Sequence, residues 1–206
     1  MSGLWNDFNS AQSNTNVIPK GTLAKVHMTL RPGGFDDPSQ GWTGGYAKRG
    51  TTGSVYLDAE FTVLDGPYAK RKIWSLIGLY SPNGPNWANM GRGLIRGILN
   101  SARGISDKDN SPEAQAKRRI NDFANLDGLE FVARIDIGKD TNGEEKNEIR
   151  AAVTPDHRDY ATLMGAIAPQ YTAPSAPGHT HSQAPSGQQN TQPSATPGTA
   201  GRPSWA

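Results

Sequence analysis

The chain contains no cysteine among its 206 residues. Disulfide bonds, a thiol nucleophile and cysteine ligands for a metal are therefore all excluded. This composition is typical of proteins from a reducing compartment. No stretch approaches the roughly 20 apolar residues that a membrane-spanning helix needs, and the first 16 residues lack the apolar core of a signal peptide. We therefore expect a cytoplasmic protein that is not associated with a membrane.

Patterns for catalysis and for metal or cofactor binding are also missing. Gly91, Gly93 and Gly97 have the wrong spacing for a dinucleotide-binding turn, and no strand leads directly into them. A calcium loop aligned on Gly143 would place Ile149 at a ligand position. No nucleophile motif is present. We expect a protein that is not an enzyme and carries no cofactor or metal ion. A nuclease or hydrolase would need acids or histidines that only folding could bring together.

Composition divides the chain into three parts. Residues 1–17 are polar and predict a flexible N-terminal segment, whereas residues 18–168 contain the core-forming segments. From residue 169 to residue 206 the chain is mostly Pro, Ser, Gly, Gln, Thr and Ala, with Arg202 as its only formal charge. Such a segment cannot bury enough apolar surface to offset the entropy of ordering, so we expect a disordered tail. Trp205 near its end is either incidental or an anchor for a protein partner.

Alternation of apolar and polar residues predicts five strands, which cover residues 22–31, 54–64, 72–80, 129–137 and 148–154. Apolar residues four apart predict a helix over residues 87–103, with Gly104 as its C-terminal cap. Ser111 caps a second helix that we expect to run to about Asn125. A short helix is expected over residues 158–167. No internal repeat is visible.

The order of these elements is three strands, a helical insert and two strands. This order predicts a mainly β protein, namely a five-stranded OB-like barrel with the helical insert between strands 3 and 4. The glycine-rich residues 32–53 are expected to form a long loop between strands 1 and 2, and loops of this length are often functional. The OB fold binds oligonucleotides on its strand 2–3 face and through its 1–2 and 4–5 loops.

A basic segment that is rich in aromatic residues falls on that hairpin and on the helix after it. Residues 66–106 contain no Asp or Glu. Cationic side chains neutralise phosphates, and aromatic faces stack on unpaired bases. Alternation places Lys72, Trp74 and Tyr80 on the face opposite Ile73, although a tryptophan in a strand can equally be a core residue. The candidate nucleic-acid-binding residues are Trp42, Tyr46, Lys48, Arg49, Tyr56, Lys70, Arg71, Lys72, Trp74, Tyr80, Arg92 and Arg96.

The segment VLDGPYAKRKIW at residues 63–74 resembles a family of bacteriophage and prophage proteins of unknown function that are similar to single-stranded-DNA-binding proteins. The segments SARGI at 101–105, SPEA at 111–114 and LDGLEF at 126–131 resemble the same family. The resemblance covers about residues 18–160. It implies an OB-type fold and an accessory role in phage replication or recombination. Cellular single-strand-binding proteins end their tails in acids followed by Pro-Phe. This tail has no acid, so the resemblance does not imply recruitment through that contact.

We therefore expect sequence-tolerant binding of single-stranded DNA, or of RNA, in the host-cell cytoplasm, by a monomer or an oligomer. If Lys70, Arg71, Lys72, Arg92 and Arg96 each neutralise a phosphate, log affinity falls against log salt with a slope of about −3.5. The alternative is a protein–protein interaction module of the same machinery that does not touch nucleic acid. Trp205 and the net charge of only +2 favour this alternative.

Overall fold

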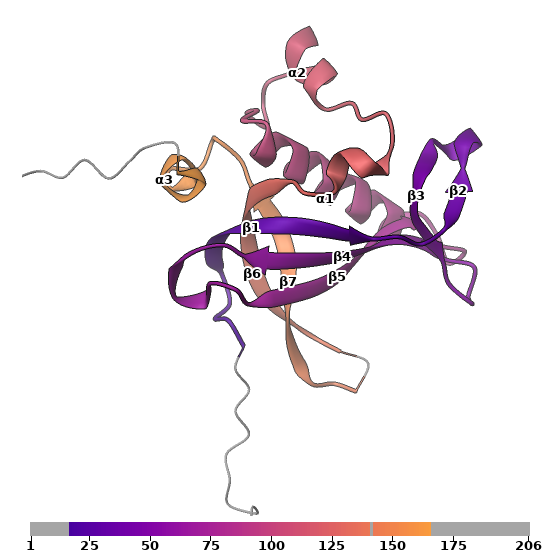
Figure 1. Cartoon of the computed structure of the whole chain (residues 1–206), viewed down its shortest axis with the longest axis horizontal. Coiled ribbons are helices and arrows are strands. Elements are labelled where there is room, and N and C mark those ends of the chain that lie inside the picture. Colours follow the sequence, from indigo (N-terminus) through magenta and orange to yellow (C-terminus); the bar gives the residue numbers. More distant parts are fainter. Residues whose placement is uncertain (1–16, 141, 166–206) are drawn as a thin grey trace, which may run out of the picture. The chain divides into compact units, whose positions relative to one another are not determined.

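A computed structural model describes residues 17–140 and 142–165 of the chain. This part is mainly β, as predicted, and forms a curled antiparallel sheet that resembles half of a barrel (Figure 1). Seven strands belong to this part of the sheet: β1 (Thr22–Arg31), β2 (Phe35–Asp37), β3 (Trp42–Arg49), β4 (Val55–Val63), β5 (Lys72–Tyr80), β6 (Glu130–Lys139) and β7 (Glu145–Val153). The helices are α1 (Asn86–Ala102), α2 (Pro112–Lys117) and α3 (Tyr160–Met164), with 3-10 turns at Pro38–Gln40, Gly66–Tyr68 and Phe123–Leu126.

Strand β4 is the centre of the sheet. One edge of β4 pairs with β1 along residues 58–63 and with β3 along residues 55–57, and its other edge pairs with β5. On the far side of β1 the ladder continues through β6 to β7, and every pairing is antiparallel. The curl brings β5 and β7 near one another, but the two strands do not form a ladder.

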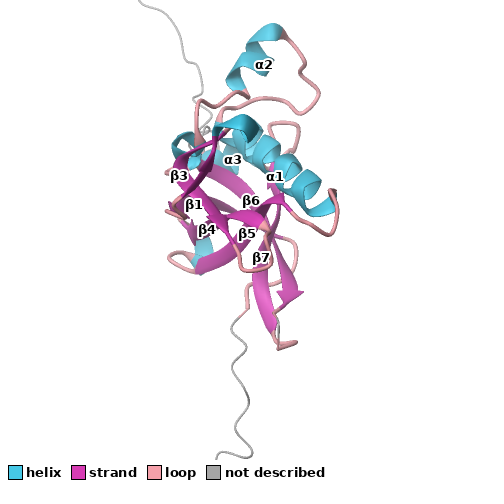
Figure 2. Ribbon diagram, turned by 90° about the vertical axis from the view of Figure 1, so that its right-hand side faces the viewer, coloured by secondary structure: helices cyan, strands magenta, loops and turns pink. Residues whose placement is uncertain are grey.

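The core lies on the concave side of the sheet because one side chain in two points there. In β4 the alternation is complete, and the residues from Val55 to Val63 at odd positions are at most 3% exposed. Phe61 of β4 meets Phe131 of β6 edge to face, with 5.8 Å between ring centroids. Ile98 and Leu99 of α1 belong to the same core. Figure 2 shows α1 lying across the strands, with α2 farther from the sheet.

Two glycines fix α1 against β5. A Cβ atom at Gly91 would lie 1.9 Å from the carbonyl oxygen of Gly78, so no other residue fits there without moving the helix. A Cβ atom at Gly78 would in turn meet the Trp87 ring at 2.4 Å. Trp87 therefore lies at the start of the helix and covers the strand. Close backbone approach of this kind is a common reason for glycine inside a regular element.

The glycine-rich segment 32–53 is not the expected long loop. It contains the hairpin of β2 and β3, which extends the edge of β4 and raises the number of strands above the predicted five. The backbone N–H groups of Gly33 and Gly34 both donate to the Gly45 carbonyl at 2.9 Å. The Asp36 carboxylate accepts a bond from the Gly45 N–H at 2.9 Å. The hairpin is therefore held by backbone hydrogen bonds and by Asp36, and its sequence lacks the apolar–polar alternation from which a strand is predicted.

The second predicted helix is also shorter than expected. Its start is confirmed, because the Ser111 hydroxyl accepts a bond from the Ala114 N–H at 3.2 Å. It ends at Lys117 rather than near Asn125. The chain then turns so that Phe123 and Leu126 can enter the core under β3. Burial of these two side chains outweighs the local preference for helix.

The remaining boundaries differ by a few residues from those predicted. Strand β7 begins three residues earlier than expected, and α3 covers Tyr160–Met164 of the helix predicted over 158–167. Residues 166–167 of that prediction and the predicted tail lie outside the described residues. Within residues 17–140 and 142–165, no helix has both the length and the apolar composition required to cross a membrane.

Candidate nucleic-acid interface

Trp74 lies on the convex face of the sheet and is not a core residue. It is opposite Glu60 in the β4–β5 ladder, and 49% of its surface is exposed. Its indole N–H donates to Glu60 Oε2 at 3.0 Å. The hydrogen bond restrains the ring while leaving about half of its surface open to solvent.

Glu60 is the electrostatic centre of this face. Lys72 Nζ lies 2.7 Å from Glu60 Oε1, and Arg31 Nη2 lies 3.4 Å from Oε2. The bond from Lys72 is the largest of several effects that lower the pKa of the Glu60 carboxyl below its ordinary value. The carboxylate is therefore ionised at neutral pH, and two cations share one negative charge. Asp58, opposite Arg31 on the same face, reduces the remaining positive charge.

Lys70 lies two residues before β5, in the turn that connects β4 to β5. It is exposed, and its φ angle of 68° is the only positive value at a non-glycine position in the described part of the chain. Its backbone N–H donates to the Val63 carbonyl at 2.7 Å, which closes the turn between β4 and β5. Left-handed backbone is unfavourable for a lysine, so the turn imposes this conformation. The adjacent Arg71 is half-buried.

Lys48 marks the opposite end of the same face. It is exposed and lies across the β3–β4 ladder from Tyr56, six residues along β4 from Thr62, the partner of Lys72. Six residues of strand span about 20 Å. The Tyr56 ring is half-buried and packs against Trp87 with 6.2 Å between centroids, so it is less available for stacking than Trp74.

Tyr80 does not share a face with Trp74, and that prediction is wrong. The β4–β5 ladder contains an irregularity at which Tyr56 pairs with Gly78 but Val55 pairs with Tyr80. The unpaired extra residue reverses the side to which Tyr80 points, because the two faces of a strand alternate. Tyr80 is instead placed beside Val55, whose side chain is buried in the core.

This shift makes Tyr80 part of a separate groove of about 250 Å³, which we call the hairpin groove. Phe35 and Trp42 lie 6.4 Å apart between centroids at 51°, and the Arg49 guanidinium carbon lies 5.7 Å from the centre of the Phe35 ring. Sequence reasoning found some of these residues but missed others, because the segment was not recognised as a hairpin. The groove is lined by Phe35, Asp37, Gln40, Trp42, Arg49, Gly53, Val55 and Tyr80. Tyr46, also predicted to stack, is half-buried and, like Phe35 and Trp42, packs against the core.

The structure does not bring the helix arginines to the β4–β5 hairpin. Arg96 is tied to Asp107, with 3.6 Å between Nε and the carboxylate, and it also donates to the Asp107 carbonyl. Arg92 is exposed on the same helix. Helix α1 touches β5 at Gly78, which lies about 20 Å along the strand from Lys72. The single basic surface predicted from the sequence is therefore divided between the β4–β5 hairpin and helix α1.

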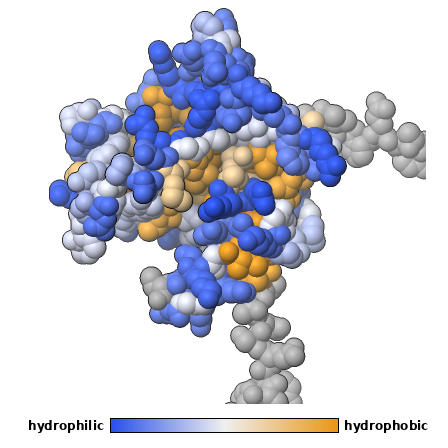
Figure 3. Space-filling model, turned by 180° about the vertical axis from the view of Figure 1, so that it is seen from behind, coloured by the Kyte–Doolittle hydropathy of each residue, from blue (hydrophilic) through white to orange (hydrophobic). Residues whose placement is uncertain are grey.

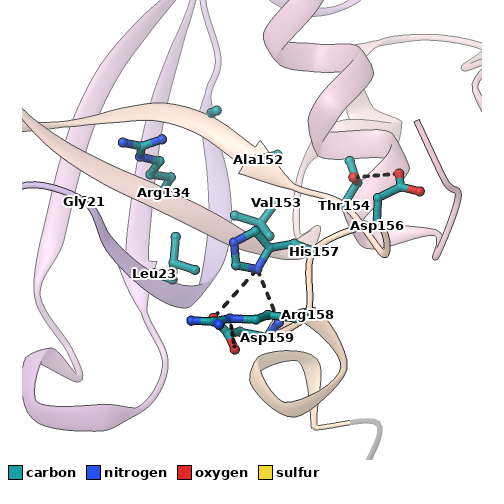
Figure 4. Close-up of a pocket in the computed structure, with 11 residues that line it drawn as sticks. Gly21, Leu23, Arg134, Ala152, Val153, Thr154, Asp156, His157, Arg158 and Asp159 are labelled. Carbon is teal, nitrogen blue, oxygen red and sulfur yellow. Dashed lines mark hydrogen bonds and ion pairs between the residues drawn. The ribbon is translucent and has the colours of Figure 1, made fainter. Parts of the chain in front are cut away.

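A larger groove of about 530 Å³ lies between β1, β6, β7 and the start of α3 (Figure 4). Arg134 and Arg158 line it, but so do Asp156 and Asp159. Arg158 Nε lies 3.5 Å from Asp159, while Asp156 accepts bonds from the Ser106 hydroxyl and from a backbone N–H. Its charges are balanced and partly engaged, so this groove favours no anion.

No family model matches the chain, and no curated protein matches it. In the part that the structure describes, no three His, Asp or Glu side chains are grouped so that they could hold a metal ion.

Proposed function

We propose that the protein binds single-stranded DNA along the convex face of β1, β4 and β5. The observation that carries this proposal is the position of Trp74. Its ring is half-exposed, its indole N–H is bonded to Glu60, and it lies two residues along β5 from Lys72, which is bonded to the same carboxylate. A restrained aromatic ring beside cations is the arrangement that stacks on unpaired bases without selecting among them. RNA presents the same phosphates and similar unpaired bases, and it is tested by the same experiment.

The fold supports the same conclusion. We propose that the half-barrel is an OB-type fold in which β1, β4, β5, β6 and β7 are the five barrel strands. Helix α1 comes between the third and fourth of these strands, and the β2–β3 hairpin fills the connection between the first and second. The β4–β5 face and that connection correspond to the surfaces by which OB folds bind oligonucleotides. Fold alone does not establish function, so the proposal depends on the side chains of the convex face.

The charges on this face limit how many phosphates it engages. Lys48 and Lys70 form no ion pair with any described residue, and Lys72, which is paired with Glu60, is the third lysine of this face, while Arg31 faces both Glu60 and Asp58. Three phosphates engaged at about 0.7 each give a salt slope near −2 rather than the −3.5 expected from the sequence. The face is about 20 Å long, which suits the shortest site sizes, about four nucleotides, of OB folds. Such binding suits an accessory protein of phage replication or recombination in the host cytoplasm.

The test is fluorescence anisotropy with a labelled, unstructured 30-mer of DNA at several salt concentrations. The expected result is binding that weakens with salt at a slope near −2, that a duplex competitor barely reduces and that an RNA 30-mer competes to a measurable degree. Binding that ignores salt, or that duplex DNA abolishes, would contradict the proposal.

The second candidate is a protein–protein interaction module. Leu76 on β5 and Met90 on α1 are 52% and 64% exposed, and they line a common depression between β5, α1 and β7. Apolar areas are visible among hydrophilic ones on the back of the molecule (Figure 3). Exposed apolar clusters mark interaction surfaces. This candidate predicts no oligonucleotide binding even at low salt. The partner-anchoring role predicted for Trp205 concerns a residue outside the described part.

A further inference from the structure

We propose that the hairpin groove binds one unstacked guanine base. This inference rests on the proposed function, because it describes how one nucleotide of a bound single strand is read. The groove lies next to the Lys48 end of the convex face, but its residues point to the other side of the sheet: Lys48 is exposed on the convex face, and the next residue, Arg49, lines the groove together with its ladder partner Val55. A strand that continues past Lys48 around the end of the sheet can therefore turn a base into the groove.

The walls of the groove suit a flat ring. Phe35, Trp42 and Tyr80 supply three aromatic surfaces, and Val55, which is 3% exposed, closes the inner end. The rings of Phe35 and Trp42 are inclined at 51°, so they do not stack on one another, and the Arg49 guanidinium lies over the Phe35 ring. Unpaired bases are commonly held on such aromatic surfaces. A volume of about 250 Å³ is large enough for a purine ring.

Two charged groups at the groove provide opposite hydrogen-bonding functions. Arg49 can only donate, and it forms no ion pair with any described residue. Asp37 can only accept when ionised. Its Oδ1 atom already accepts bonds from the Ser39 N–H at 3.1 Å and hydroxyl at 2.6 Å. Its Oδ2 atom has no hydrogen bond within the described part of the chain and is available to a ligand.

Guanine is the base that matches this pair of groups. Its O6 and N7 atoms accept bonds, and arginine is their most common partner. Its N1–H and N2–H₂ groups are adjacent donors that one carboxylate can accept. Adenine and cytosine present a ring nitrogen acceptor beside the amino group, which would face the carboxylate unfavourably. Thymine offers a single N–H between two carbonyls. Leaving a polar group unpaired in such a site is what produces discrimination.

The test compares five 15-mers of thymidine that carry a central dT, dG, dA, dC or deoxyinosine, each titrated by anisotropy at fixed salt. We expect the dG oligomer to bind about tenfold more tightly than the all-dT oligomer, which corresponds to one bidentate pair. Deoxyinosine lacks the N2 amino group and should fall between the two. Equal affinities for all five oligomers, with tight binding of the all-dT strand, would overturn the guanine inference and leave the proposed function standing.

The matched variants are Asp37→Asn and Asp36→Asn. Asparagine at 37 keeps an oxygen for the bonds from Ser39 but replaces the free acceptor with a donor. It should abolish the dG preference, measured as the ratio of the affinities for the dG and all-dT strands with the same variant. Asp36→Asn makes the same change in charge one residue away, outside the groove, and should keep the preference. A dG preference that survives Asp37→Asn would overturn the inference.

A second measurement tests the groove without any oligonucleotide. In ¹H–¹⁵N spectra of the full chain, dGMP should shift the indole N–H signal of Trp42, and dAMP should shift it much less. If no oligomer binds at all, the proposed function fails. The absence of any dGMP-specific shift at Trp42 would overturn the guanine inference by itself.

Discussion

Trp74 and Glu60 lie opposite one another across the β4–β5 ladder, and the indole N–H of Trp74 donates to Glu60 Oε2 at 3.0 Å. The same carboxylate binds Lys72 and Arg31. One acidic residue thus restrains the ring that is proposed to stack on bases and also withholds part of the positive charge that is proposed to meet phosphates. Its two effects on nucleic-acid binding are opposite and can be separated by mutation.

Replacing Trp74 with Ala should weaken binding of the 30-mer by about 5-fold to 150-fold, because one stacked base contributes about 1–3 kcal/mol. The free energy of unfolding should change by about 1 kcal/mol or less, since half of the side chain is exposed. Anisotropy and urea denaturation check the two effects. Leu76→Ala is the control, because it removes a neighbouring exposed apolar side chain that has no ring. If Leu76→Ala weakens binding as much as Trp74→Ala, general apolar contact rather than stacking is responsible.

Replacing Glu60 with Gln should strengthen oligonucleotide binding at low salt and make the salt slope steeper, because Arg31 and Lys72 lose their shared anion. The same variant should change the dependence of stability on pH. The pKa of Glu60 is lowered in the folded state, so its stabilising effect is present above the ordinary value of 4.5 and is lost as the pH falls through the lowered value.

Glu60→Gln should therefore lose less stability than the natural chain during acidification below about 4.5. Urea denaturation over an acidic pH series measures this difference. Lys72→Met, which removes the largest cause of the shift, should flatten the same part of the curve. Parallel stability curves for the natural chain and Glu60→Gln would contradict the assignment.

Replacing Lys70 with Gly should stabilise the fold by about 0.5–1 kcal/mol, because the left-handed backbone at φ 68° suits glycine. The gain is limited by the greater chain entropy of glycine in the unfolded state. The salt slope should fall in magnitude by about 0.7, because one phosphate contact is lost. Lys70→Asn, which tolerates this backbone without the same entropy cost, should give the same change in slope. An unchanged slope in both variants would remove Lys70 from the interface.

Gly91 and Gly93 form a matched pair on α1. Gly91→Ala should destabilise the protein by about 1–3 kcal/mol, because its Cβ atom would lie 1.9 Å from the Gly78 carbonyl oxygen. Gly93→Ala meets nothing within 4 Å and should stabilise the helix by about 1 kcal/mol. Thermal denaturation of the two variants compares them directly. Equal effects would show that α1 does not dock on β5 through this contact.

Much of the fold could be predicted because the core side of a strand repeats every two residues. The strands that became β1, β4 and β5 follow directly from this period, and the Ser111 cap follows from local hydrogen bonding. The presence of aromatic and basic residues on the β4–β5 hairpin is likewise visible in the chain. Their role in binding nucleic acid stays a prediction.

The sequence by itself determined which residues alternate, which side chains carry charge and, to within one residue, where α1 and α2 begin. Only the tertiary structure decided that residues 32–53 contain a hairpin, that Tyr80 turns away from Trp74 and that the helix arginines lie apart from Lys72. The physical reason is that these features depend on contacts between distant segments. An unpaired residue in β5 changes the side to which Tyr80 points, and the Gly78–Gly91 contact fixes where α1 crosses the sheet. Neither effect leaves a periodic signal in the chain, because each depends on a partner far away in the sequence.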